Sequence, residues 1–331
     1  MVYMYCVMSE AYLIVIISSA WANWLLILII RVYQSLKQGI SRRYSNPRLF
    51  HIPNLLLTAD SEGAIGRESN DNMDYNKQLD DLFIRWMESL DEERRNLFCK
   101  DGLMLKADKP EEYVDERWNK MQRRVMFLVK DKNTPDGDDT RRWSLDENMC
   151  KLSGGNVGRT GFFPNIARIF YGLQVITADN KGVGADELTK DKKNEVLQVW
   201  NTEPFAFVEA KKVAGHSCVS SEEVTKAMQR DKEFLKEEID ILRPNIILCC
   251  DAGDSQFNFI TSEYFAGKEA EKIEYTYPLA PHMKCCLWYY PDDCVAVIKS
   301  YHPTRTGKQG DWVIYERVIS PFRKLVTNHK I

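Results

Sequence analysis

Short apolar runs and longer amphipathic segments alternate along most of the chain. The short runs are continuous and cover 124–129, 204–208, 245–250, 283–290 and 295–300. Such runs are typical of strands that are buried on both faces. In the longer segments, apolar residues recur every three or four positions, which predicts helices over 78–95, 113–122, 163–173, 220–242, 255–265 and 311–326. The alternation of the two patterns predicts an α/β fold.

Several of the expected strands end in a polar loop, as parallel strands buried between two layers of helices do. We therefore expect a three-layer α/β/α sandwich with a central, mainly parallel sheet. Ligands of such sheets bind beyond the carboxyl ends of the strands. The charged, glycine-containing stretch 178–196 is expected to be a surface insertion.

An uncharged apolar segment lies near the amino terminus. Residues 11–30 hold eleven Leu, Ile or Val residues and are long enough to cross a bilayer. Lys and Arg residues follow the segment and only Glu10 precedes it. The positive-inside rule then predicts one transmembrane helix in the cell membrane, with the rest of the protein on the cytoplasmic side. A cleaved signal peptide, a buried core helix and a misassigned start codon are the alternatives.

These patterns divide the chain into three regions. Residues 1–32 form the expected anchor, and 33–75 form a juxtamembrane linker that contains Pro, Gly and polar residues without periodicity. Residues 76–331 form the expected α/β domain.

The overall charge narrows the function classes. The formal net charge is −3, so the chain lacks the strongly basic composition of a simple nucleic-acid binder. The net charge does not exclude a local basic groove. Nine cysteines include the neighbouring pairs Cys249–Cys250 and Cys285–Cys286 in expected strands. Neighbouring strand residues point to opposite faces, so we interpret these pairs as packing thiols in a reducing compartment.

Two of the loops after the expected strands carry carboxyl groups. In the first, Asp131 and Asn133 could position a water molecule or ligate Mg²⁺, or they could simply be solvated. In the second, Glu209 could accept hydrogen bonds from the amino group of a base, or it could pair with a lysine such as Lys211. Lys211 is also a candidate phosphate ligand.

Two further loops carry groups that suit a phosphate. Gly253 lies at an expected strand-to-helix turn, where the missing side chain lets a phosphate or sugar approach the backbone. His302 is followed by a proline and by Arg305 and Lys308. This segment therefore combines a titratable donor, His302, with two phosphate-binding cations. The alternative for this last segment is an ordinary surface turn.

Several well-known sites are missing from the sequence. We find no Walker A sequence, no GxGxxG after a strand and no GxSxG elbow. The histidines have no cysteine or carboxylate at zinc spacing, so no metal and no cofactor is expected.

An ordered set of five segments resembles the uracil-DNA glycosylase superfamily. In this chain the segments read RVMFLVKDKN, GFFPNIARIFYGL, FAFVEAKK, LRPNIILCCDAG and VIKSYHPTRTG. The resemblance covers about residues 120–326 and implies a uracil-DNA glycosylase-like fold. It also implies hydrolysis of the N-glycosidic bond of a flipped nucleotide, with DNA or a nucleotide as the partner.

The resemblance implies a role for each candidate residue. Asp131 or Asn133 would hold the attacking water, Phe162 or Phe163 would stack on the base, and His302 would stabilise negative charge on the leaving base. Arg305 and Lys308 would bind backbone phosphate.

Three features depart from the superfamily pattern. Val129-Lys130 stands where members usually have Gly, and Glu209 stands where an Asn reads uracil. An ionised Glu209 accepts hydrogen bonds but does not donate them, so it would disfavour uracil. The cysteines lack the spacing of the iron-sulfur branch, so no cluster is expected. Two functions stay open: an N-glycosylase, or a non-catalytic module that binds nucleotide or nucleic acid. In either case residues 11–30 are expected to tether the protein to the lipid bilayer.

Overall fold

The computed structural model describes residues 8–9, 12–13 and 74–329, apart from 107, 133–135, 145–151, 154–156, 158–160, 179–181, 216–218, 252, 277–283 and 305–311. The chain divides into two compact units, Met1–Glu68 and Ser69–Ile331. In the first unit, strands β1 (Met8–Ser9) and β2 (Tyr12–Leu13) form an antiparallel pair.

The expected transmembrane helix is not found. Among the described residues, no helix is long and apolar enough to cross a membrane. Tyr12 and Leu13, which the sequence pattern assigns to that helix, bond to a neighbouring strand, so their backbone groups are not paired within a helix. The predicted fold class, which included one transmembrane helix, is therefore wrong in that feature. The remainder of 11–30 lies outside the described residues, and the membrane location stays a prediction.

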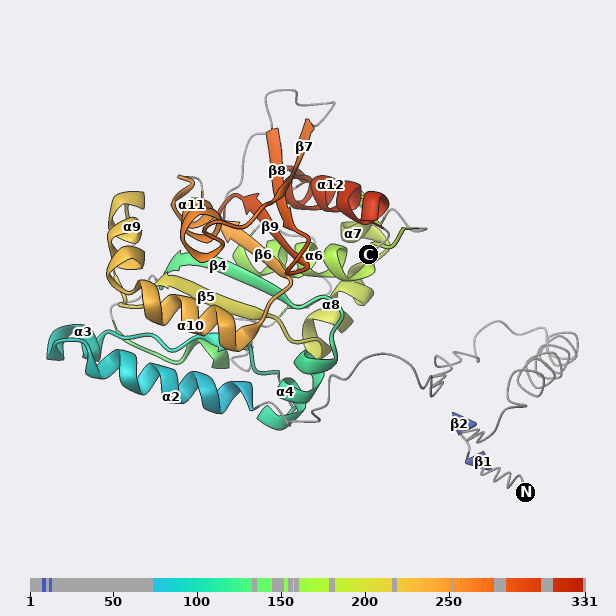
Figure 1. The fold of residues 1–331 in the computed structure, drawn as a ribbon. Coiled ribbons are helices and arrows are strands. Elements are labelled where there is room, and N and C mark those ends of the chain that lie inside the picture. Colours follow the sequence, from blue (N-terminus) through green and yellow to red (C-terminus); the bar gives the residue numbers. More distant parts are fainter. Residues whose placement is uncertain are drawn as a thin grey trace, which may run out of the picture. The chain divides into compact units, whose positions relative to one another are not determined.

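One seven-stranded sheet forms the centre of the second unit (Figure 1). Its order is β3–β5–β4–β6–β9–β8–β7. The strands are β3 (Gly102–Leu103), β4 (Val125–Asp131), β5 (Ala206–Lys211), β6 (Ile246–Cys250), β7 (Glu271–Thr276), β8 (Lys284–Tyr290) and β9 (Val295–Ser300).

The sheet is mixed, so the expectation of a mainly parallel sheet is wrong. The strands β5, β4, β6 and β9 pair in parallel at the centre, whereas β3, β8 and β7 pair antiparallel toward the two edges. Only residues 291–294 separate β8 from β9. A connection of this length allows an antiparallel hairpin but not the crossover that parallel strands need.

Helices cover both faces of the sheet. They are α2 (Tyr75–Glu88), α3 (Glu92–Asn96), α4 (Glu111–Lys120), α6 (Phe162–Val175), α7 (Ala185–Lys190), α8 (Lys193–Thr202), α9 (Ser221–Arg230), α10 (Lys232–Leu242), α11 (Ser255–Phe259) and α12 (Trp312–His329), with a 3₁₀-helix η1 (Thr140–Ser144) and a π-helix η2 (Ile260–Tyr264). Helices α6, α8 and α12 lie on one face, and α2, α9, α10 and α11 lie on the other (Figure 1).

Two helical regions differ from the expectation. The stretch 178–196 is not a simple surface insertion, because it contains α7 and the start of α8, and its residues Leu188 and Val196 are buried. The expected helix over 220–242 is divided at Asp231 into α9 and α10. The first of these begins with a capping box, in which Ser220 and Glu223 satisfy each other's backbone N–H groups.

A buried ion cluster joins the end of β5 to the segment before β3 and to the helices on one face of the sheet. The Lys212 ammonium lies 2.6 Å from Asp101, just before β3, and 2.7 Å from Glu238 on α10. All three side chains are fully buried. The ammonium also lies 5.4 Å from the centroid of the Trp86 ring on α2. The cluster therefore connects the sheet to α10 and α2.

Replacing Lys212 with methionine is expected to lower the free energy of unfolding by about 3–5 kcal/mol, because two buried carboxyl groups lose their cation. Urea unfolding measures the change. Lys226→Met is the matched control, since Lys226 lies 2.7 Å from Glu222 in an exposed pair and its loss should cost no more than about 1 kcal/mol. Equal effects of the two substitutions would contradict the assignment.

Candidate functional site

The carboxyl ends of the four parallel strands meet at one edge of the sheet. Asp131 and Lys211 are the last residues of β4 and β5 and face each other in register. His302 follows the end of β9, and Gly253 follows the end of β6. This edge thus collects candidate residues from four separate segments of the chain.

Asp131 is buried against a lysine. Its Oδ2 atom lies 3.3 Å from the Lys211 Nζ atom, which also donates to the Val213 carbonyl at 2.7 Å. Burial raises the pKa of Asp131, and the charge of Lys211 opposes that rise. Lys211, a candidate phosphate ligand, therefore already holds this carboxylate.

Gly215 lies close to this ion pair. A Cβ atom on Gly215 would lie 2.8 Å from the Lys211 Nζ atom and 2.9 Å from the Asp131 Oδ2 atom. These separations are shorter than a Cβ atom tolerates, so a side chain here would displace the pair. Gly215 thus permits the close approach of its loop to Asp131.

Glu209 lies between these residues and the apolar part of the site. Phe207, Glu209 and Lys211 are alternate residues of β5, so their side chains share one face of the sheet. Glu209 is 1% exposed, and no hydrogen-bond donor among the described residues reaches either carboxyl oxygen. Burial, followed by the charge of Asp101, raises its pKa well above 4.5. Burial therefore favours the neutral form of Glu209, which has one donor and one acceptor.

His302 is held as a neutral imidazole. Its Nδ1 atom accepts from the Thr304 backbone N–H at 3.3 Å and lies 2.7 Å from the Thr304 hydroxyl. We therefore assign the ring proton to Nε2. Burial, followed by the charge of Lys130, lowers the pKa of His302 below 6.5. The imidazole can thus donate one neutral hydrogen bond.

Helix α6 fixes the segment that carries His302. The Asn165 Nδ2 atom donates to the Pro303 carbonyl at 2.5 Å. Arg168, one turn further along α6, donates to the Asn165 side-chain oxygen and so orients that amide. Both side chains are buried.

Aromatic rings connect His302 to β5. The Phe162 ring centroid lies 5.6 Å from that of His302 and 5.7 Å from that of Phe207. Phe163 contacts Phe162 at 5.1 Å, and Trp143 of η1 contacts Phe163 at 6.0 Å. Both phenylalanines expected to stack on a base therefore lie in one cluster, and Phe162 contacts the histidine.

Gly253 lies in a groove between α9 and α11. Its N–H group donates to the Asp251 carboxylate, and a Cβ atom in its place would lie 2.3 Å from the Ser221 hydroxyl. The groove has a volume of about 350 Å³ and is lined by Gly253, Ser221, Thr225 and Asn258 among others, but not by Asp131, Glu209 or His302. Gly253 thus has a packing role, and its N–H group is already bonded.

Three candidate residues, Asn133, Arg305 and Lys308, lie outside the described residues. Within the described part of the chain, no group of three or more His, Cys, Asp or Glu side chains is placed to hold a metal ion.

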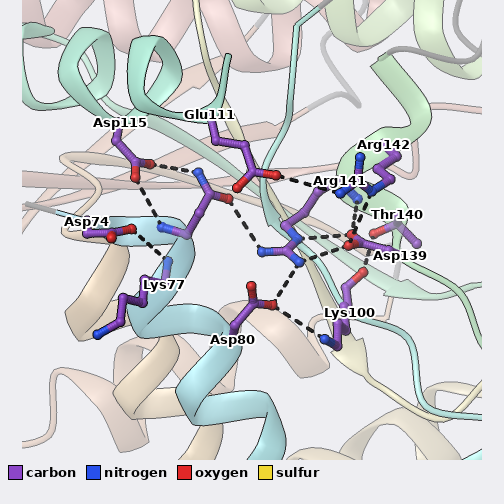
Figure 2. Close-up of polar contacts among 11 residues, drawn as sticks. Asp74, Lys77, Asp80, Lys100, Glu111, Asp115, Asp139, Thr140, Arg141 and Arg142 are labelled. Atoms are coloured by element: carbon purple, nitrogen blue, oxygen red, sulfur yellow. Dashed lines mark hydrogen bonds and ion pairs between the residues drawn. The ribbon is translucent and has the colours of Figure 1, made fainter.

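The acidic segment after β4 is held by ion pairs. Asp138 accepts from the buried Lys132 at 2.6 Å. Figure 2 shows Arg141 between Asp139 and Asp80, with separations of 2.8 and 2.9 Å. The Arg141–Asp80 pair therefore attaches the segment to α2, whereas the other two pairs lie within the segment.

The same network reaches two helices that precede the sheet. The Asn76 side-chain oxygen of α2 lies 3.4 Å from the Arg141 guanidinium, and its amide donates to Asp115 of α4 at 2.7 Å (Figure 2). Asp80, also on α2, pairs with Lys100 at 3.4 Å. Helices α2 and α4 thus support the segment that leads from Asp131 to Trp143.

Three residues of the site escaped the sequence analysis. Trp143 lies in the 3₁₀-helix η1 and Gly215 lies in the loop after β5, and neither position has a signal in the sequence pattern. Asn165 does have a signal, because it is a polar residue on the apolar face of an expected helix, where a buried amide needs a partner.

No family model matches this chain, and no curated protein is significantly similar to it.

The buried Asp115 makes a testable contribution to stability. Burial raises its pKa from 3.8 to about 7, so between these values the folded chain holds a proton that the unfolded chain has released. Stability from this group is therefore lost as the pH rises through that window, with a slope of at most about 1.4 kcal/mol per pH unit. Urea unfolding across the window should show a smaller loss for Asp115→Asn than for the unchanged chain. Parallel curves for the two proteins would contradict the raised pKa.

Proposed function

We propose that this chain is an N-glycosylase that hydrolyses the bond between a nucleobase and its sugar. One observation carries the proposal: Asp131, Glu209 and His302 lie at or just after the carboxyl ends of parallel strands, beside an aromatic cluster. The four strand segments that resemble the uracil-DNA glycosylase superfamily are also the four that pair in parallel. That coincidence supports the resemblance.

The proposed reaction uses Asp131 and His302. The Asp131 carboxylate, which faces the Lys211 ammonium group, accepts a proton from a water molecule whose oxygen attacks the anomeric carbon. The N-glycosidic bond breaks, and its electron pair leaves with the base. The resulting negative charge reaches a carbonyl oxygen of the base, where the His302 Nε2–H group donates a hydrogen bond.

Glu209 is proposed to read the edge of the base. A neutral carboxyl group presents one donor and one acceptor, as an amide does. It therefore suits a base edge that offers a carbonyl oxygen beside an N–H group, which uracil has. An ionised Glu209 would disfavour uracil, but burial favours the neutral form, which does not.

A binding module without hydrolysis is the second candidate. The observation that favours it is the Asp131–Lys211 pair, because a carboxylate that already has a cation is a weaker base. A binder would keep its nucleotide affinity in Asp131→Asn and lose it in variants of Glu209.

The first test measures base release by the full chain. Single- and double-stranded oligonucleotides and free nucleotides that carry uracil, hypoxanthine, xanthine, alkylated or ordinary bases are incubated with the protein, and released base is detected by mass spectrometry. His302→Ala and Asp131→Asn are each expected to lower the rate by about a hundredfold or more. His329→Ala is the matched control, because His329 pairs with Glu271 at the end of α12. A folded protein that releases no base from any substrate would overturn the enzyme proposal.

The second test concerns the protonation of Glu209. Base release should fall as the pH rises through the raised pKa of Glu209, because the ionised group no longer donates. Glu209→Gln keeps a donor and an acceptor at every pH, so it should retain activity and lose this alkaline decline. Glu209→Leu should lose most of the activity while it leaves the protein folded. An unchanged alkaline decline in Glu209→Gln would exclude Glu209 as its source.

A further inference from the structure

A second cavity lies at the opposite edge of the sheet, where the parallel strands begin. Its volume is about 350 Å³. Arg124 precedes β4, Asn245 precedes β6, and Val295 begins β9, and all three line the cavity. It is also lined by Arg243 at the end of α10. This cavity is separate from the site that contains Asp131 and His302.

Two arginines line this cavity, and hydrogen bonds hold Arg124 in place. The Arg124 Nε atom donates to the Arg243 carbonyl at 2.7 Å, and the Arg124 backbone N–H donates to the Asn245 side chain at 2.8 Å. In the described part of the chain, no Asp or Glu forms an ion pair with either guanidinium. Burial, and then the like charge of Arg243, lowers the pKa of Arg124. The two positive charges thus repel each other.

The acidic residues of the cavity already have donors. Asp240 accepts from the Tyr264 hydroxyl at 2.6 Å, and Asp293 accepts from the Lys268 ammonium at 2.6 Å. They are therefore engaged with groups other than the arginines.

The backbone at Arg243 is in a conformation that glycine usually provides. Its φ and ψ angles are 47° and 51°, and its N–H group donates to the Ile239 carbonyl at 2.8 Å, which ends α10. A side chain with a Cβ atom costs free energy in this left-handed region. The helix end would be more stable with glycine, so the arginine side chain costs stability here.

We propose that this cavity binds the phosphate group of a small phosphorylated molecule, through the guanidinium groups of Arg124 and Arg243. Guanidinium groups bind phosphate oxygens through paired, charge-assisted hydrogen bonds. A phosphate would also relieve the repulsion between the two arginines. The volume suits a ligand of the size of a sugar phosphate or a nucleotide. The proposal does not depend on the glycosylase proposal.

The test measures thermal unfolding of the full chain with increasing inorganic phosphate at constant ionic strength. Phosphate should raise the unfolding midpoint of the unchanged chain. Arg243→Gly removes the guanidinium and the left-handed strain together, so its midpoint without phosphate should be equal or higher, while its apparent phosphate affinity falls roughly tenfold or more. Arg124→Lys, which keeps the charge but not the paired donors, should also weaken the response.

A matched control separates the loss of strain from the loss of the cation. Asp108 also has a positive φ, of 62°, and does not line the cavity, so Asp108→Gly should keep the full phosphate response. His302→Ala should keep it as well, which distinguishes this site from the proposed active site. A sugar phosphate and a nucleoside monophosphate, tested in the same way, identify the source of the phosphate by which one acts at the lower concentration. No midpoint shift in the unchanged chain, or an equal shift in Arg243→Gly, would overturn the proposal.

Discussion

The ammonium group of Lys212, the residue directly after β5, is buried between two carboxyl groups. Each partner comes from a different layer, Asp101 from the segment before β3 and Glu238 from α10. A buried charge without a partner is strongly destabilising, so these elements have to come together in one arrangement. Asp101 also accepts the Glu209 backbone N–H at 2.5 Å. The ion cluster therefore fixes the strand that presents Glu209 to the candidate site.

Burial then sets the protonation of the site itself. It raises the pKa of Asp131 and Glu209 and lowers that of His302, so desolvation favours the neutral form of each group. Lys211 opposes this trend for Asp131, and Lys212 and Lys132 oppose it for Glu209. The site thus combines a carboxyl group that faces an ammonium group with a second carboxyl group and a histidine whose neutral forms burial favours. The opposite edge of the sheet differs, because Arg124 and Arg243 line a cavity there and form no ion pair with an Asp or Glu of the described residues.

The central elements could be predicted from the sequence because their signals are local. The run before Lys130 predicts β4, and the spacing from Phe163 to Leu173 predicts most of α6. The edge strand β7 was missed because only Ile273 among its residues is buried, so it lacks an apolar run. The mainly parallel sheet was a wrong expectation, although the four-residue connection between β8 and β9 already required an antiparallel pair.

The central strands and most of the helices of the α/β unit could be predicted from the sequence alone, because apolar periodicity reflects the faces that each segment must bury. The sequence also identified Asp131, Glu209 and His302 as candidates, since each follows or ends an expected strand. Only the tertiary structure decided how these groups are charged and what they contact, because burial, the Asp131–Lys211 pair and the contact of Phe162 with His302 arise between segments far apart in the chain. The cavity with Arg124 and Arg243 arises in the same way, since its residues come together only when β4 pairs with β6.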